Sequence, residues 1–222
     1  MKNLRLRGVS SVEFTFEILV LVPLLLGTGI IGVNMVKNLQ TTQVARDVGH
    51  MFARGINFGQ PGNLTVVGNL GQNLGLNTAG GGNAVVILSA VTYVDDNACA
   101  GAGEADTHGV HTGACTNYGN WVFQQRVTVG NPSVRSSNYG APLTSGPTGV
   151  PMNSDGTITL TNYCTYAGAR ATFSGVNPYS IVNGQAQGLP SGQVLYIAEA
   201  AAYGYNMQPF VNNAVSYSWG IF

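Results

Sequence analysis

The stretch ILVLVPLLLGTGIIGVNMV, residues 18 to 36, carries no charged side chain and consists mainly of Leu, Ile and Val. A helix needs about 20 such residues to cross the hydrocarbon core of a bilayer, and this stretch has nineteen. It ends without an A-x-A-like cleavage site and continues into helix-compatible sequence, unlike a cleaved secretory signal. The stretch therefore predicts a helix that spans a membrane.

Beyond residue 36 the hydrophobic pattern becomes that of an amphipathic helix. Apolar side chains recur at three-, four- and five-residue intervals, with charged and amide side chains largely between them. These apolar positions are Leu39, Val44, Val48, Met51 and Phe52. Gly55, with further Gly and Pro residues close behind it, supplies the stop signal. We therefore expect one helix over residues 9–57, roughly 70 Å long, whose first half spans the membrane.

A basic head precedes the apolar stretch. Lys2, Arg5 and Arg7 all lie before Gly8, and the positive-inside rule then predicts a cytoplasmic N-terminus. Charged residues make up only 8% of the chain, and Gly contributes 31 residues, so the surface must be built largely from small and uncharged polar side chains. Such a surface suits a secreted or filament protein. No other Lys and Arg cluster provides a nucleic-acid footprint, so no nucleic-acid partner is expected.

Glu13 is an acid at the edge of the apolar stretch, and Glu17 follows one helical turn later. Two explanations of Glu13 remain open. In the first, it is an interfacial acid solvated by lipid headgroups. In the second, a peptidase cuts after Gly8, and Val9 then carries a new amino group about one helical turn from the carboxylate. The positive end of a helix favours an acid, and an ammonium partner in low dielectric stabilises it further.

The octapeptide RGVSSVEF, residues 7 to 14, resembles the class III signal of type IV pilin-like proteins. The shared features are a basic leader that ends in Gly8, Glu13 five residues later, the aromatic Phe14 and a long apolar helix. With Pro23 inside the apolar run, the chain is more similar to the TadE-like minor pilins of tight-adherence (Tad) systems than to the major pilins. The major pilins of this family are much shorter and usually carry Tyr after the glutamate.

This resemblance implies a processing site between Gly8 and Val9, cut by a prepilin peptidase. It also implies that the helix beginning at Val9 packs among the helices of other pilin subunits. Glu13, followed by Phe14, matches the family glutamate that pairs with the N-terminal amine of a neighbouring subunit during assembly. Glu13 and Phe14 are therefore the expected assembly residues.

After residue 61 the sequence shifts to Gly, Asn, Thr and aliphatic residues, and partly alternating β-branched runs replace the helical period. The predicted strands are Ala84–Val94, Trp121–Val129, Thr157–Thr161, Val194–Tyr203 and Ala214–Phe222. A long helix followed by several strands predicts an α+β fold in which an antiparallel sheet rests on the second half of the helix. The expected organisation is a leader at 1–8, the helix at 9–57 and an extracytoplasmic β-rich domain at 58–222.

The order of a strand, a two-cysteine loop, the strand WVFQQRVTVGN and the polar segment SVRSSNYG also resembles the extracellular part of long TadE-like proteins. Residues 130–156 are rich in Gly, Pro, Ser and Asn, and they are too many for a hairpin loop. We expect a surface loop of the Ω type, where contacts to neighbours or ligands tend to lie.

The chain has three cysteines, all in its second half. If the domain lies outside the cytoplasm, Cys99 and Cys115 are well placed to close a Gly-rich loop, which stabilises a domain by roughly 3 kcal/mol. Three alternatives remain for Cys164: a buried thiol, an intermolecular partner, or the true mate of one of the other two.

His108 and His111 lie near Glu104, Asp106 and two cysteines, a composition that suggests a metal site. An H-x-x-H spacing in a Gly-rich loop has no helix to direct both rings to one point, and thiols in a disulfide cannot bind zinc. The Asp95–Asp96 pair is not followed by a calcium-loop pattern. We expect neither a metal site nor a cofactor.

The chain has no nucleophile motif, phosphate loop or paired carboxylates outside the membrane helix, so an enzyme is not expected. Glu199 lies in a strand-like run, where we expect an edge or outward-facing acid. Several aromatic residues near the C-terminus are expected to pack on the sheet rather than to form a stacking platform for a ligand: Tyr196, Tyr203, Tyr205, Tyr217 and Trp219.

The sequence thus predicts a structural subunit: a TadE-like, pilin-like protein of a Tad or type IV-like pilus or of its assembly complex. It would be stored in the bacterial inner membrane, with its domain in the periplasm, and would be incorporated into an extracellular pilus. The expected partners are other pilin subunits, prepilin peptidase and the inner membrane. The rival hypothesis is a permanently anchored binding or adhesion module whose helix never leaves the bilayer, and whose sheet or 130–156 loop recognises a surface ligand.

Overall fold

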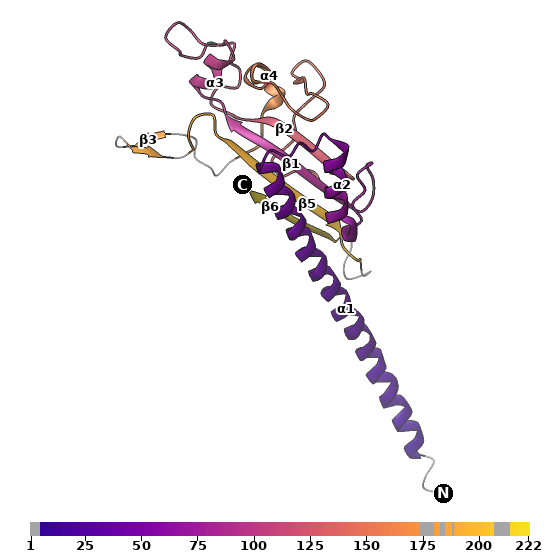
Figure 1. The fold of residues 1–222 in the computed structure, drawn as a ribbon. Coiled ribbons are helices and arrows are strands. Elements are labelled where there is room, and N and C mark those ends of the chain that lie inside the picture. Colours follow the sequence, from indigo (N-terminus) through magenta and orange to yellow (C-terminus); the bar gives the residue numbers. More distant parts are fainter. Residues whose placement is uncertain (1–4, 174–179, 183–184, 188, 207–213) are drawn as a thin grey trace.

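A single helix, α1 (Arg5–Ala53), dominates the architecture and continues without a break through Pro23. The computed structural model describes residues 5–173, 180–182, 185–187, 189–206 and 214–222, with side chains from residue 12 onward except in 180–182 and 185–187. Figure 1 shows that the C-terminal half of α1 lies on a sheet, while its N-terminal half extends away from the rest of the chain. The predicted long apolar helix is confirmed.

α1 ends at Ala53, four residues before the expected boundary at residue 57. Gly55 adopts a left-handed φ of 82°. Its N–H donates to the carbonyl of Phe52 at 2.9 Å, and the N–H of Ile56 donates to the carbonyl of Met51 at 3.2 Å. These two bonds form a Schellman motif, which satisfies the last carbonyls and reverses the chain.

Four antiparallel strands form the main sheet, in the order β2-β1-β5-β6. Their bounds are β1 (Ala84–Tyr93), β2 (Trp121–Gly130), β5 (Val194–Tyr203) and β6 (Val215–Ile221). All four were predicted, with boundaries that agree to within one residue. β1 lies between two partners and is buried along nearly its whole length, as expected for a run of aliphatic residues at the centre of a sheet. The α+β class is confirmed.

The fifth predicted strand, Thr157–Thr161, was wrong. Thr157 forms only an isolated bridge to Gln125 of β2, and a short helix, α4 (Leu160–Thr165), begins three residues later. The Thr159 side chain accepts a backbone N–H from the first turn of α4 at 3.4 Å and so caps it. The composition of Thr157–Thr161 favours a strand, but the Thr159 cap stabilises a helix instead.

The remaining elements are short. They are α2 (Pro61–Leu70), the 3₁₀ turns η1 (Gln72–Leu74) and η2 (Ala167–Ala169), α3 (Asp96–Gly101), and the hairpin of β3 (Ser180–Val182) and β4 (Gln185–Gln187). In Figure 1, α3 and α4 lie at the end of the sheet that is remote from the free half of α1. The globular part therefore has a proximal end, near the middle of α1, and a distal end.

The sheet is covered on both faces. On one face, Val48 and Phe52 of α1 pack with alternate residues of the central strands, including Leu88 and Ala200. On the other face, Val134 and other parts of the polar segment after β2 cover a second layer of buried side chains. The segment 130–156 is thus held on the sheet along part of its length.

Glu199 in β5 was predicted to be an edge or outward-facing acid, and this was wrong. Its side chain is 1% exposed, and β5 lies between β1 and β6. The carboxylate accepts hydrogen bonds from the Ser137 hydroxyl, from the Asn138 N–H at 2.9 Å and from the Tyr217 hydroxyl at 2.7 Å. Through the bonds from Ser137 and Asn138, Glu199 therefore holds the segment after β2 on the sheet.

Arg126 of β2 is a second buried charge on this face. Its guanidinium donates to the Ser89 hydroxyl and, at 2.9 Å, to the carbonyl of Gly140. Burial lowers the pKa of Arg126 to about 10, and the negative charge of Glu199 opposes that shift. Arg126 and Glu199 thus belong to one buried polar layer, which holds parts of the segment after β2 on this face of the sheet.

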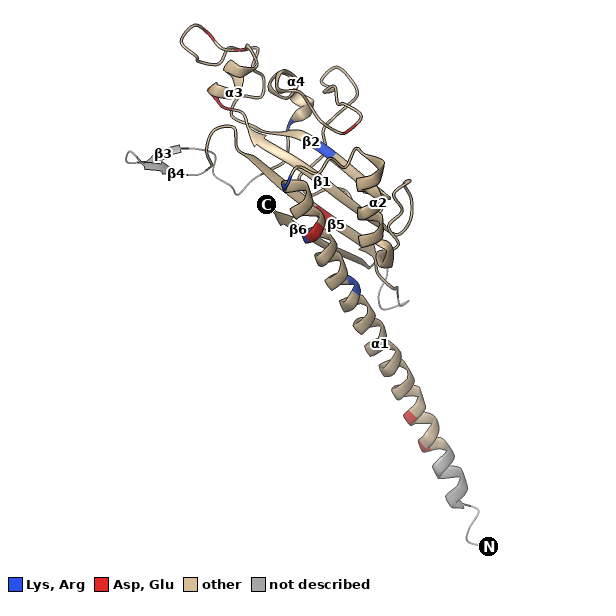
Figure 2. Cartoon of the chain, viewed as in Figure 1, with Lys and Arg blue, Asp and Glu red and all other residues tan. Residues whose placement is uncertain are grey.

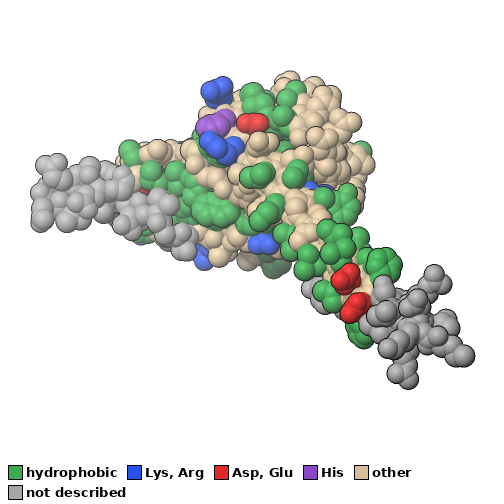
Figure 3. Space-filling view, turned by 90° about the horizontal axis from the view of Figure 1, so that it is seen from below, with side chains coloured by type: hydrophobic (Ala, Val, Ile, Leu, Met, Phe, Trp, Pro, Cys, Tyr) green, Lys and Arg blue, Asp and Glu red, His purple; other side chains and the backbone are tan. Residues whose placement is uncertain are grey.

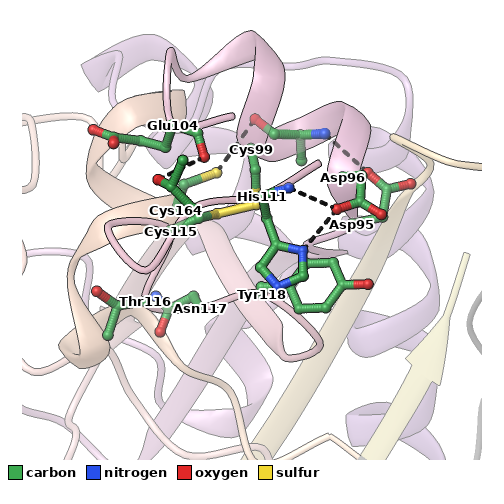
Figure 4. The surroundings of a disulfide bond; sticks show 12 residues. Asp95, Asp96, Cys99, Glu104, His111, Cys115, Thr116, Asn117, Tyr118 and Cys164 are labelled. Atoms are coloured by element: carbon green, nitrogen blue, oxygen red, sulfur yellow. Dashed lines mark hydrogen bonds and ion pairs between the residues drawn. A yellow bond between two sulfur atoms is a disulfide. The ribbon is translucent and has the colours of Figure 1, made fainter. Parts of the chain in front are cut away.

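A disulfide joins Cys99 to Cys115, the pairing favoured from the sequence. It ties α3, which lies at the distal end (Figure 1), to the loop that precedes β2 (Figure 4). Cys164 in α4 is a free, buried thiol whose sulfur lies 3.6 Å from the carbonyl oxygen of Ala98. Of the three alternatives for Cys164, the structure supports the buried thiol.

Cys164 is expected to resist thiol reagents while the chain is folded. Burial, with the negative charges of Asp95 and Glu104, raises its pKa to about 11. At pH 8 about one molecule in a thousand then carries the reactive thiolate, so labelling by a chromogenic disulfide reagent should be about 100-fold slower than in denaturant. The unreduced, denatured chain should titrate one thiol and the reduced chain three. Rapid labelling of the native chain would contradict a buried thiol.

Candidate functional site

The most distinctive surface is the free N-terminal half of α1. Every side chain from Val12 through Leu26 is exposed, and most of them are large and apolar. Val12–Ala53 is the one helix, among the described residues, that is long and apolar enough to cross a membrane. Figure 3 shows this apolar surface running along the protruding helix. The chain therefore carries a candidate membrane anchor.

Glu13 and Glu17 lie on this apolar surface, one helical turn apart, and both are exposed. In Figure 2 the acidic positions on the protruding half of α1 lie close to the outer end of the described helix, and a long uncharged stretch separates them from the next charge. Within the described part of the chain neither carboxylate forms an ion pair. A partner for either acid in an apolar environment must therefore come from the N-terminal residues or from another molecule.

The other residues predicted for processing and assembly also lie on α1. Gly8 and Val9 are within the helical backbone, and their side-chain surroundings lie outside the described residues. The helix begins at Arg5, so residues 5–8 of the expected leader continue α1 rather than form a separate segment. Phe14 is 62% exposed and makes no ring contact with the described part of the chain. α1 thus presents the whole predicted site on one helix.

Asn34 and Lys37 of α1 hold the globular part through hydrogen bonds to the chain that follows β5 and to its last residue. The Asn34 amide accepts a hydrogen bond from the N–H of Tyr205 at 2.8 Å and donates one to its carbonyl at 3.2 Å. The Lys37 ammonium donates to the carbonyl of Tyr203 at 2.8 Å and lies 4.2 Å from the centre of the Tyr205 ring. The end of β5 is therefore fixed at one height on the helix.

The loop around His111 is organised by local contacts (Figure 4). The Asp96 carboxylate bonds to the His111 ring nitrogen at 2.8 Å and accepts its backbone N–H at 3.0 Å. These contacts lower the pKa of Asp96. The His111 ring stacks on Tyr118 with 3.4 Å between ring centres, and Asp95 caps α3. Among the described residues no three His, Cys, Asp or Glu side chains are grouped to hold a metal ion.

The C-terminal aromatic residues have two different placements. Tyr196 packs edge-on against Phe52 of α1 with 5.3 Å between ring centres, and Tyr217 binds Glu199, so both belong to the sheet packing that was predicted. Trp219 is half exposed and lies beside Tyr139. Tyr205 follows β5, is 54% exposed and lies against α1, which the strand pattern did not indicate.

Sequence reasoning missed Asn34 and Lys37 and misassigned Glu199. One signal was present for Lys37, because it is the first charged residue after the uncharged stretch. No local pattern distinguished Asn34, whose partner is 171 residues away along the chain.

No protein-family model matches the chain, and neither a curated protein nor a solved structure matches it. The fold and the site define an α+β protein with an N-terminal helix fit to cross a membrane and a sheet packed on the helix's second half.

Proposed function

We propose that the chain is a pilin-like structural subunit of the TadE-like type rather than an enzyme. It serves a Tad or type IV-like pilus or the assembly complex of that pilus. The observation that carries the proposal is the division of α1: its first half is exposed and apolar, and its second half forms the core with an antiparallel sheet. A helix of this kind can exchange lipid contacts for contacts with other helices while the globular part stays folded.

The basic head before Gly8 supports a cytoplasmic N-terminus in the inner membrane and a periplasmic domain. The Cys99–Cys115 disulfide is consistent with an oxidising compartment such as the periplasm. After cleavage at Gly8, the amine of Val9 and the carboxylate of Glu13 would provide opposite charges near the end of α1. In low dielectric such a pair between neighbouring subunits would align their helices during assembly.

Cleavage after Gly8 is the direct test. The full chain is co-expressed with a prepilin peptidase, and the wild type and Gly8→Ala are weighed by mass spectrometry. The wild type should lose residues 1–8, because the peptidase recognises the Gly8–Val9 junction, and Gly8→Ala should keep them. Gly27→Ala is a matched control on the same helix, where an added methyl group meets nothing within 4 Å. It should be processed like the wild type.

A wild-type chain that keeps residues 1–8 would remove the main support for the filament. That result would favour the rival hypothesis, a permanently anchored extracytoplasmic binding or adhesion module.

A further inference from the structure

The junction between α1 and the proximal end of the sheet is built from few residues with well-defined contacts. Asn34 holds the backbone of Tyr205 through two hydrogen bonds, and Lys37 holds the carbonyl of Tyr203 and the face of the Tyr205 ring. We call Lys37, Tyr203 and Tyr205 the proximal seat. Because the side chains of Asn34 and Lys37 make three hydrogen bonds to the backbone of Tyr203 and Tyr205, the two tyrosines keep a fixed position along the helix axis.

The height of the proximal seat agrees with the length of the apolar stretch. Residues 18–36 are uncharged, and as a helix they rise about 28 Å, close to the thickness of a hydrocarbon core. Lys37 is the next residue along α1. If the uncharged stretch fills the bilayer, the proximal seat lies at the level of the lipid headgroups, on the side where the globular part is found.

The side chains of the proximal seat suit that level chemically. Tyr205 is 54% and Tyr203 is 36% exposed, and tyrosine is enriched at membrane interfaces because its ring is apolar while its hydroxyl needs water or a headgroup. Lys37 donates one hydrogen bond to the protein, and an ammonium group has three N–H donors. From Ile18 through Val36 and on to Arg46, α1 carries no acid that would oppose a phosphate.

We propose that the proximal seat docks on the phospholipid headgroups of the periplasmic leaflet, with Lys37 facing a lipid phosphate and Tyr205 inserted among the headgroups. The inference rests on the proposed membrane-inserted state of the subunit and adds a second membrane contact, made by the globular part. It sets the height and the tilt of the domain above the bilayer before assembly.

Tryptophan quenching by brominated lipids tests this contact in the full chain. The chain is reconstituted into vesicles of phosphatidylcholine and phosphatidylglycerol, with bromine placed either near the carbonyl end or deep in the acyl chain. Tyr205→Trp is made in a Trp219→Phe background, which leaves buried Trp121 as a constant signal. The matched control is Tyr166→Trp, because Tyr166 is 38% exposed and follows α4 at the distal end.

Shallow bromine should quench the fluorescence of the Tyr205→Trp chain about twofold more than that of the Tyr166→Trp chain. In the Tyr205→Trp chain, shallow bromine should also quench more than deep bromine. Lys37→Gln should reduce that quenching, whereas Lys37→Arg keeps the charge and should retain it. Arg54→Gln removes one charge from an exposed position farther along α1 and should have no effect.

Sedimentation with the vesicles measures membrane insertion separately and so distinguishes membrane anchoring by α1 from the headgroup contact of the proximal seat. A chain that inserts and shows equal quenching at positions 205 and 166 overturns the headgroup contact, while membrane anchoring stands. A chain that fails to insert overturns both, and the cleavage test then decides whether the subunit hypothesis survives.

Discussion

Replacement of Glu13 by alanine should strongly reduce incorporation of the proposed subunit into its filament without preventing its insertion into the membrane. Removing an acid from an apolar helix makes insertion easier, since a charge at membrane depth is costly. Incorporation should suffer because the partner amine would be left alone among apolar helices. A close pair of opposite charges at an effective dielectric near 20 attracts by about 4 kcal/mol. Desolvation of the two charges offsets much of this attraction, so a net loss of about tenfold in incorporation is expected.

The measurement compares sheared filaments with the membrane fraction, using an antibody to the globular domain. Glu17→Ala is the matched control: it removes the same charge from the same exposed helix, one turn farther from Val9. It should be incorporated far better than Glu13→Ala. Unchanged incorporation of Glu13→Ala, or equal losses for both variants, would exclude a specific pairing of Glu13.

The long helix and the four strands of the main sheet could be predicted because each follows from a local pattern. Residues 18–36 are an uncharged apolar run of about the length that crosses a hydrocarbon core, and β1 and β5 are β-branched or small-residue runs bounded by Gly and Asn. Both faces of the sheet are covered, so β1 and β5 are buried on both sides and appear in the sequence as nearly continuous apolar runs. The prediction was accurate where the local signal and the tertiary packing agree.

The errors arose where one contact outweighs composition. Gly55 was recognised as the stop signal of α1, but the boundary was placed at residue 57, because the sequence does not show that the left-handed Gly55 ends the helix at Ala53. Thr159 began a helix in a segment rich in Thr and Ile, because a capping hydroxyl satisfies the first free N–H groups.

The candidate site was predictable in part. The processing and assembly residues of α1 were found from charge and hydropathy along one segment. The contacts at the proximal seat, by contrast, join Asn34 and Lys37 to residues 166 or more positions away. The cysteine pairing was favoured from spacing, but the burial of Cys164 depends on contacts with α3. Glu199 was misassigned because small neighbours gave no sign that three donors surround its carboxylate.

Glu199→Ala should be the most destabilising single change in the sheet. The variant leaves the Asn138 N–H and the Ser137 and Tyr217 hydroxyls without their acceptor in a buried layer. It also removes the negative charge that counteracts the lowering of the Arg126 pKa by burial. Breaking a buried charge network in this way costs about 3–5 kcal/mol, a large share of the roughly 5–15 kcal/mol that stabilises a domain. Urea unfolding of the detergent-solubilised chain measures the loss.

Asp47→Ala is the control for Glu199→Ala, because Asp47 is an exposed acid on α1 and its removal should change the free energy of unfolding by less than about 0.5 kcal/mol. Tyr217→Phe removes only one donor to Glu199 and should cost about 1–2 kcal/mol. In the double variant the two losses should not add, since both act on one hydrogen bond. Additive losses, or a Glu199→Ala cost no larger than that of Asp47→Ala, would mean that apolar packing alone holds the segment after β2 on the sheet.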